Sequence, residues 1–382
     1  MSKKVKHKVL SLFANIGVAE AYLDDIGIKV CVANELIKKR ADIYQRIYPA
    51  TKVITGSILD SKVFDRICEE SIKQSVSVVM ATPPCQGMST AGEQNPEDER
   101  NILTMPALEA IKRILPKYAI IENVANYVNT CVVHNGERLL LTDIIKNELG
   151  NEYNITVNII NTEDFGVPQS RERVIVLLSR KDMKEWSIPA KHDKIVTMKD
   201  AIGDLPEVDP FVKDIPKDEF ESLFPLFNER AKKAREISRW HVPPTHIYRQ
   251  VIAMRYTPTG KTAFDNDTYK PRKEDGTLVR GYRNTYMRQK WDTPAYTITM
   301  DNRKISSQGN VHPGRYIGND ANGVAMYSDP RVLTLYEIMR IMSLPEDWAL
   351  PHDVDEAFIR RIIGEGIPPY FVKQLFENIP NE

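Results

Sequence analysis

The chain has 382 residues, no formal net charge, and 42% hydrophobic against 27% charged residues. This composition excludes a disordered chain, and the absence of any apolar run of about 18 residues excludes a transmembrane helix. The length predicts two or three domains, or one large α/β domain that carries an insertion. The four cysteines show neither CxxC spacing nor a disulfide framework, which indicates a reducing compartment such as the cytoplasm.

The first 180 residues alternate short apolar runs with helical patterns. We expect strands at 8–14, 30–33, 53–55, 76–81, 118–121, 155–160 and 173–178. We expect helices at 19–26, 35–47, 106–115 and 139–149, the first of them closed by Gly27. Continuous apolar strands alternating with helices predict a parallel, doubly wound α/β sheet that is covered on both faces.

From about residue 190 the alternation is lost and prolines become frequent, which predicts a second, irregular domain at 190–300. Its expected strands are 249–256, 282–287 and 295–300. Residues 228–290 contain 15 Lys and Arg against 6 Asp and Glu, so the neutral total hides one basic segment. Helical patterns return at 334–342, 357–363 and 369–378, so the first domain would comprise 1–189 and 301–382.

The segment from Leu12 to Val18 follows the first strand, where Rossmann-like folds bind adenosine-containing ligands. Gly17 is its only glycine, so the glycine-rich pyrophosphate fingerprint is absent. Glu35 ends the second strand, where an acidic residue can bind ribose hydroxyls. These features predict an adenosine ligand without a pyrophosphate, such as S-adenosylmethionine. An ordinary strand–turn–helix with a solvated Glu35 is the equal alternative.

Two later strand ends carry reactive side chains. A pair of prolines stiffens the turn after the strand at 76–81 and presents Cys85 at the carboxyl end of the sheet. A lone cysteine is usually a small buried hydrophobe, but this one has a stiff turn before it and a Gly- and Ser-rich stretch after it. Glu122 directly follows the strand at 118–121, where apolar neighbours can raise the pKa of a carboxyl and let it carry a proton.

Arg171 and Arg173 lie two residues apart, so they point to the same face of an extended segment. Their guanidinium groups could clamp a carbonyl oxygen and a phosphate. A strand edge decorated with surface charges is the alternative.

The order of these segments resembles that of the DNA (cytosine-5) methyltransferases. The motifs are Phe-x-x-x-Gly at 13–17, Asn-Glu at 34–35, Pro-Cys-Gln at 84–86, Glu-Asn-Val at 122–124 and Gln-x-Arg-x-Arg at 169–173. The resemblance continues through 291–299 and 331–345, and covers 8–180 and 288–382. It implies a Rossmann-like S-adenosylmethionine-dependent methyltransferase fold, with 190–300 as a smaller, irregular target-recognition domain.

The resemblance also implies roles for individual residues. Cys85 would add to carbon 6 of a flipped cytosine, Glu122 would protonate ring nitrogen 3, and Arg173 would hold the base's carbonyl oxygen with Arg171 beside it. The cofactor would contact Phe13, Gly17, Glu35, Ile58, Pro84, Leu103, Glu365 and Gly366. DNA would contact Gln86, Ser89, Arg272, Arg280, Arg283 and Arg288.

Several positions depart from the family's pattern. Residues 11–18 correspond to the family's usual Asp-Leu-Phe-x-Gly-x-Gly-Gly. Here Ser11, Asn15 and Val18 replace the aspartate and two of the glycines. Ser57 replaces an aspartate that contacts adenine, and Leu36 replaces a frequent aromatic. The usual Gly-Asn-Ala/Ser-Val near the C-terminus is Gly-Glu-Gly-Ile at 364–367. These departures concern the cofactor contacts and leave the reacting residues intact.

The implied substrate is double-stranded DNA with a specific short recognition sequence, the implied cofactor is S-adenosylmethionine, and no metal is expected. The default expectation is a restriction–modification role, with a cognate endonuclease that acts on the same site. We expect a monomer in the cytoplasm that is associated with the nucleoid when bound to DNA. One alternative is an RNA cytosine-5 methyltransferase, although the tRNA-modifying branch carries a Cys-Phe-Thr tripeptide and this chain has no cysteine after Cys131. Another is a catalytically silent DNA-binding relative. A nicotinamide oxidoreductase is disfavoured by the missing glycines.

Overall fold

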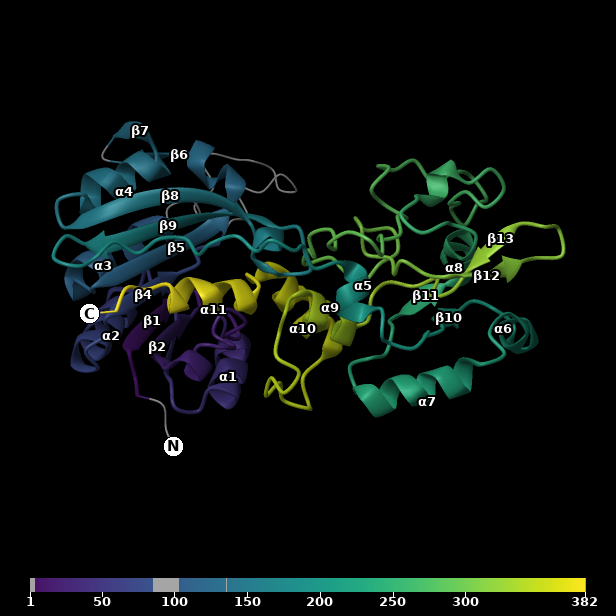
Figure 1. Ribbon diagram of the computed structural model, residues 1–382, viewed down its shortest axis with the longest axis horizontal. Coiled ribbons are helices and arrows are strands. Elements are labelled where there is room, and N and C mark those ends of the chain that lie inside the picture. The colour runs from purple at the N-terminus through teal and green to yellow at the C-terminus, as the bar shows by residue number, and fades with distance from the viewer. Residues whose placement is uncertain (1–3, 85–102, 135, 382) are drawn as a thin grey trace.

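The computed structural model describes residues 4–84, 103–134 and 136–381. Figure 1 shows two lobes side by side, the first built on a large sheet and the second on short helices and strands. Helices α5 (Met198–Ile202), α9 (Leu335–Ile341) and α10 (Glu356–Glu365) lie between them.

The first lobe contains a seven-stranded sheet in the order β3-β2-β1-β4-β5-β9-β8. Its strands are β1 (His7–Leu12), β2 (Ile28–Glu35), β3 (Lys52–Thr55), β4 (Val78–Ala81), β5 (Tyr118–Val124), β8 (Tyr153–Asn161) and β9 (Glu172–Arg180). The first five strands run parallel, whereas β9 runs antiparallel to both β5 and β8. The prediction of a wholly parallel sheet is therefore wrong at β9, because the short connection 162–171 leaves no room for a helical crossover.

Both faces of the sheet are covered, as the continuous apolar strands predict. Leu10 and Leu12 of β1 join a core with α2 (Ser61–Lys73), α3 (Thr104–Ile114) and α4 (Leu141–Leu149). Val9, on the opposite face, packs in a core with Trp186 and α11 (Pro369–Glu377). A small hairpin, β6 (Cys131–His134) with β7 (Glu137–Leu140), precedes α4.

The segment 19–26 is a turn that ends in a short 3-10 helix, η1 (Asp24–Ile26), so the helix predicted there is wrong. Gly27 does close it, with φ 78°. The next helix, α1 (Lys38–Ile47), is confirmed but begins three residues later than predicted. Glu35 explains the delay, because its carboxylate accepts the backbone N–H of Ile37 and holds that residue in an extended turn.

The second lobe has its own core, in which Phe224, Val251 and Met254 pack with Ile305 and Val332. Its elements are β10 (Phe211–Lys213), α6 (Lys217–Leu223), α7 (Phe227–Ile237), β11 (Thr245–Ile247), α8 (Tyr248–Arg255), the 3-10 helix η5 (Ala263–Asp265), β12 (Tyr316–Asn319) and β13 (Ala325–Tyr327). The strand predicted at 249–256 is wrong, because that segment forms α8. The strands predicted at 282–287 and 295–300 are isolated bridges only.

A further core joins the two lobes at the carboxyl edge of the sheet. Ile16 and Val18 pack there with α1, α5, α9 and α10, and with Ala295 and Ile298. The chain thus passes back into the first lobe at 295–298, and the second-lobe core continues from 305 to 332. None of the helices in the described ranges is long and apolar enough to cross a membrane.

Candidate active site

The sheet brings the predicted motifs to one edge. Strands β2, β1, β4 and β5 are parallel neighbours, so the residues that follow them lie side by side. The loops after β1 and β4 are also tied directly, since Thr82 donates a hydrogen bond from Oγ1 to the carbonyl oxygen of Phe13 at 3.3 Å. The arrangement places the cofactor motifs beside the catalytic motifs, as the resemblance implies.

The turn before Cys85 is held by the strand next to it. Asn123, with only 2% of its surface exposed, donates from Nδ2 to the carbonyl oxygen of Pro83 at 3.0 Å. Its Oδ1 accepts the backbone N–H of Val124, which fixes the amide in this orientation. The end of β5 therefore braces the proline turn. Cys85, Gln86 and Ser89 themselves lie outside the described residues.

Glu122 and Arg173 form an ion pair at this edge, with 2.9 Å between Oε1 and Nε and only 12% and 11% of the side chains exposed. Because β9 is antiparallel to β5, its first residues lie at the carboxyl end of β5, and Arg173 stands opposite Val124. Burial raises the pKa of Glu122, while the charges of Arg173 and Arg171 oppose this rise. A buried carboxyl with a raised pKa next to a guanidinium can supply a proton to a bound base and stabilise negative charge beside it.

Arg171 is not placed as predicted. It is 2% exposed, and its guanidinium donates to the carbonyl oxygens of Ile298 at 2.8 Å and Gly364 at 2.9 Å. With so little of its surface exposed, Arg171 does not present its guanidinium group for the phosphate clamp that the sequence allows. Its several donors instead join the start of β9 to the returning segment at 298 and to the end of α10.

The loop after β1 is held against β2. Asn15 donates its backbone N–H to Glu35 Oε2 at 2.9 Å, and Glu35 is only 6% exposed. Gly17 has φ 82°, and a Cβ there would lie 2.2 Å from the ring of Tyr48. The Tyr48 hydroxyl also donates to the carbonyl oxygen of Gly17 at 2.6 Å. Only glycine fits this position, because of its left-handed φ and the packing of the Tyr48 ring against it.

The residues at this edge fit an adenosine ligand with a polar tail. Glu35 still has acceptor capacity after its two backbone hydrogen bonds, and the Oδ1 of Asn15 is buried with no partner among the described residues. Two exposed leucines follow strands at this edge: Leu36 (64% exposed) comes directly after β2, and Leu59 (59% exposed) lies in the turn between β3 and α2. Ile58 is 4% exposed and packs in the core, so its predicted adenine contact is wrong.

Pro84 and Leu103, by contrast, are partly exposed and remain available to a ligand. The sequence alone did not single out Leu59 and Arg40 at this edge, and it marked Asn15 only as a departure from the family's pattern. In the sequence, Leu59 looks like any other surface leucine. Only its position in the fold, close after the end of a strand, distinguishes it.

Glu20 is buried beside the cofactor loop, with 3% exposure, and its Oε1 accepts a hydrogen bond from Ser11 Oγ at 2.6 Å. Burial raises the pKa of Glu20 to about 7, and the hydrogen bond from Ser11 offsets only part of the rise. An aspartate at position 11, the family's usual residue, would place a second carboxylate against Glu20. The serine avoids that repulsion.

We expect a Glu20→Gln variant to be more stable than the parent protein above neutral pH. In the unfolded chain this carboxyl ionises near 4.5, whereas in the folded protein its pKa is about 7. Stability is therefore lost as the pH rises between these values, a cost on the order of 2 to 3 kcal/mol that glutamine avoids. Thermal unfolding should show a higher Tm for the variant at about pH 8 and little difference at about pH 5.

The exposed Glu152→Gln substitution is the matched control, because it removes the same charge without changing a buried site. An equal gain for Glu20→Gln at both pH values would contradict the assignment of a raised pKa.

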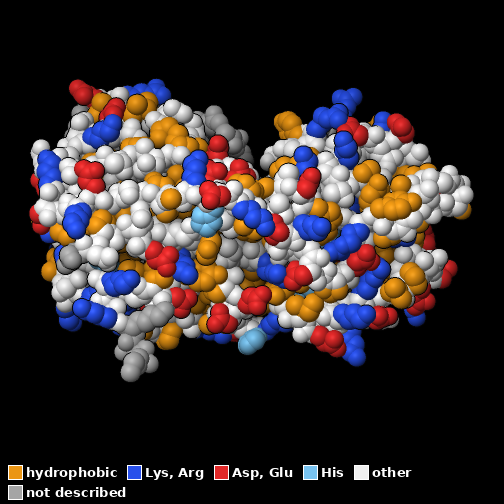
Figure 2. All heavy atoms as spheres, viewed as in Figure 1, with side chains coloured by type: hydrophobic (Ala, Val, Ile, Leu, Met, Phe, Trp, Pro, Cys, Tyr) orange, Lys and Arg blue, Asp and Glu red, His pale blue; other side chains and the backbone are white. Residues whose placement is uncertain are grey.

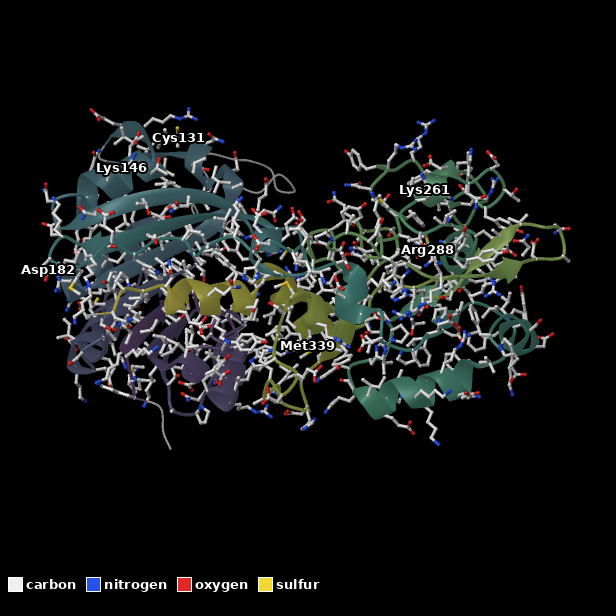
Figure 3. All side chains as sticks on the ribbon, in the orientation of Figure 1. Cys131, Lys146, Asp182, Lys261, Arg288 and Met339 are labelled. Atoms are coloured by element: carbon white, nitrogen blue, oxygen red, sulfur yellow. The ribbon has the colours of Figure 1, made fainter. Side chains whose placement is uncertain are left out.

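The arginines predicted to bind DNA separate into two groups. Arg272, Arg280 and Arg283 are exposed, and Tyr282 beside them is 81% exposed. Arg288 is completely buried and donates to four backbone carbonyls, those of Met254, His312, Ser328 and Asp329. The prediction that Arg288 contacts DNA is therefore wrong. Figure 3 shows it inside the second lobe, near α8.

The two lobes leave a notch between them at the upper margin of Figure 2. Lys and Arg side chains are spread over the visible face of the second lobe, as the basic balance of 228–290 predicts. The loop segment 266–284, which carries the three exposed arginines, belongs to this lobe.

The comparison with known protein families agrees with the motifs. A model of the C-5 cytosine-specific DNA methylases matches residues 7–381. Over 378 residues the chain is 39% identical to the Type II methyltransferase M1.HgaI of Avibacterium volantium, with 98% of each chain covered. It is 25% identical to the Type II methyltransferase M1.HphI of Haemophilus parahaemolyticus, covering 97% of this chain and 86% of that protein.

Solved structures share the fold at low sequence identity. A putative DNA modification methyltransferase encoded within an Escherichia coli prophage superposes with a TM-score of 0.62 at 18% identity, covering 98% of this chain and all of that one. A Spodoptera frugiperda DNMT2 mutant gives 0.56 at 14% identity, covering 98% and 99% of the two chains. The resemblance drawn from five short motifs is thus confirmed along the whole chain, which belongs to the C-5 cytosine-specific DNA methylase family.

Proposed function

We propose that this chain methylates carbon 5 of one cytosine in a short duplex sequence, as the modification enzyme of a type II restriction–modification system. The observation that carries the chemical part is the buried Glu122–Arg173 pair at the end of β5, beside the turn that Asn123 holds in front of Cys85. The names of the two relatives, both Type II methyltransferases, support the biological part.

In the proposed mechanism the target cytosine leaves the duplex and enters the edge formed by β4, β5 and β9. The Cys85 thiolate forms a bond to carbon 6 while Glu122 gives a proton to ring nitrogen 3, so that carbon 5 becomes nucleophilic. Arg173 stabilises the charge on the base's carbonyl oxygen. S-adenosylmethionine supplies the methyl group. Carbon 5 then loses its proton to water, the bond from carbon 6 to sulfur breaks to release the Cys85 thiolate, and ring nitrogen 3 returns its proton to Glu122.

The residues proposed to hold S-adenosylmethionine surround the loop after β1. Glu35 would accept from the ribose hydroxyls, and Leu36 and Leu59 would lie against the adenine. The remaining contacts proposed are Phe13, Gly17, Pro84, Leu103, Glu365 and Gly366. Gln86 and Ser89, in the segment after Cys85, would contact the DNA backbone.

The second lobe is the proposed target-recognition unit. Its core supports limits of about 206–332 for this unit, later than the 190–300 expected from composition, because 305–332 packs with α8 and α5 packs with the first lobe. Arg272, Arg280 and Arg283 would contact the DNA that enters the notch. One base is modified per turnover, so a monomer suffices, and a cognate endonuclease would act on the same sequence.

Bisulfite sequencing of plasmid DNA tests the proposal, with the chain expressed in bacteria that lack cytosine methylation of their own. We expect protected cytosines at one position of one short recurring sequence, and none in cells with the empty vector. Soluble, folded protein without any protected cytosine would overturn the proposed DNA activity. Protection without a common sequence would overturn the restriction–modification role.

A further inference from the structure

The loop after β1 contacts the end of α10, a segment 350 residues away in the sequence. Asn15 donates from Nδ2 to Glu365 Oε2 at 3.3 Å. Glu365 in turn forms an ion pair with Arg40 of α1, with 2.9 Å between Oε2 and Nη1 and only 21% and 18% of the two side chains exposed. One carboxylate therefore joins the cofactor loop, the helix after β2 and the C-terminal part of the chain.

A second contact lies one turn along the same loop. A Cβ on Gly366 would lie 3.0 Å from Val18 Cγ1 and 3.2 Å from Val18 Cβ. These distances are shorter than ordinary van der Waals contact, and Val18 is buried with 3% exposure, so it has little room to move. A side chain at 366 would therefore force Val18, and the loop that carries it, to shift by a few tenths of an ångström.

These four residues are among the positions at which the two segments depart from the family's pattern. The loop carries Asn15 and Val18 in place of glycines, and the C-terminal segment carries Glu365 and Gly366 in place of Asn and Ala or Ser. In the structure the changed residues contact each other pairwise, Asn15 with Glu365 and Val18 with Gly366. In the second contact the bulk gained at Val18 matches the bulk lost at Gly366, whereas in the first contact two polar side chains form a hydrogen bond.

We propose that Asn15, Val18, Glu365 and Gly366 form two matched contacts that together set the position of the cofactor loop for S-adenosylmethionine. The inference rests on the proposed binding of this cofactor at the loop. Val18 and Asn15 are positioning residues, which act through Gly366 and Glu365. Changing one side alone moves the loop and weakens cofactor binding, and changing both sides together restores much of it.

The charge of Glu365 explains why this residue cannot be replaced by a neutral one without a cost. Glu365 faces Arg40 and, at 3.8 Å, the exposed Arg361. The Nε of Arg40 is already buried with no partner among the described residues, so the loss of the carboxylate would leave a half-buried guanidinium without its charged partner. Asn15 has φ 55°, a left-handed conformation that glycine adopts without strain, so Asn15→Gly removes the contact and leaves the backbone intact.

Two double-mutant cycles test the proposal by calorimetric titration with S-adenosylhomocysteine, the expected product, together with the Tm of each free protein. The first cycle comprises Val18→Gly, Gly366→Ala and the double variant. We expect Gly366→Ala to raise the Kd about tenfold in the parent, and by less than about threefold when residue 18 is glycine. The second cycle comprises Asn15→Gly, Glu365→Asn and their combination. There the effects should again be less than additive, by about threefold or more.

The exposed Lys38→Ala substitution, which removes a surface ion pair on α1, is the control and should leave the Kd unchanged. Additive effects on the Kd in both cycles would overturn the matched contacts. So would variants that lower Tm while binding the ligand with the parent's affinity, because the contacts would then be structural only. A parent protein that does not bind S-adenosylhomocysteine at all would instead refute the proposed cofactor site, which distinguishes the two failures.

Discussion

Replacing Glu122 with glutamine is expected to lower the rate of methyl transfer by about 10²- to 10⁴-fold while leaving DNA binding in place. Glutamine keeps the shape of the side chain and can still accept from Arg173, but it has no acidic proton to give to ring nitrogen 3 of the base. Because burial raises the pKa of Glu122, the carboxyl holds this proton at higher pH than an exposed glutamate would. Single-turnover transfer of labelled methyl groups to a substrate duplex measures the effect.

The control for this variant is Glu172→Gln, an exposed position next to Arg173 whose side chain alternates to the other face of β9. Cys85→Ala provides the reference for complete loss, since no addition to carbon 6 is then possible. For the parent, kcat should fall as the pH rises through the pKa of Glu122. If the Glu122→Gln variant transferred methyl groups at a rate within about threefold of the parent's, the proton would have to come from another group.

The parallel part of the sheet could be predicted from the sequence because its strands read as short apolar runs, and its inner strands β1 and β4 are buried on both faces. The direction of β9 could not be read from its own residues, since an apolar run has the same composition in either direction. Only the short connection 162–171 carried the information. The segment 249–256 is ambiguous for another reason. Its buried residues Val251 and Met254 fit one face of a short helix, but eight residues are too few to distinguish the helical period of 3.6 residues from the strand period of two.

At the site, the sequence predicted which residues gather at one edge but not how deeply each is buried. Arg171, Arg173 and Arg288 have the same chemistry, but Arg173 forms an ion pair with Glu122 at the edge, whereas the other two are more deeply buried. Arg171 and Arg288 donate hydrogen bonds to backbone carbonyls of distant segments, and no local sequence pattern predicts such contacts. The contact between Asn15 and Glu365 is equally invisible, because it depends on where α10 ends relative to the first loop.

An Arg331→Met variant is expected to lose about 3 to 5 kcal/mol of folding stability, the largest effect we expect from a residue outside the active site. Arg331 is completely buried and forms ion pairs with Asp329 at 2.7 Å and Glu337 at 2.9 Å. It also donates from Nε to the carbonyl oxygen of Val208. One guanidinium group therefore links three segments: Val208, where the chain enters the second lobe, Asp329, where it leaves, and Glu337 in the first turn of α9. Methionine fills much of the volume but removes the ion-pair partner of two buried carboxylates, each of which then faces His312 at 3.8 Å. Chemical denaturation measures the loss.

The comparison that isolates the buried charge is Arg46→Met, which removes an exposed arginine paired with Asp353 and should change stability little. The pH dependence gives a second check. Burial alone would raise the pKa of Glu337, but the charges of Arg331 and His312 and the hydrogen bond from Arg331 together lower that pKa to about 2. Without Arg331, Glu337 takes up a proton more readily, so the deficit of the variant should shrink as the pH falls from about 7 toward about 4. The parent itself loses stability over this range, because burial holds the pKa of His312 at about 4, well below the value near 6.5 in the unfolded chain. A deficit that stays constant with pH would assign the loss to packing rather than to the unpaired carboxylates.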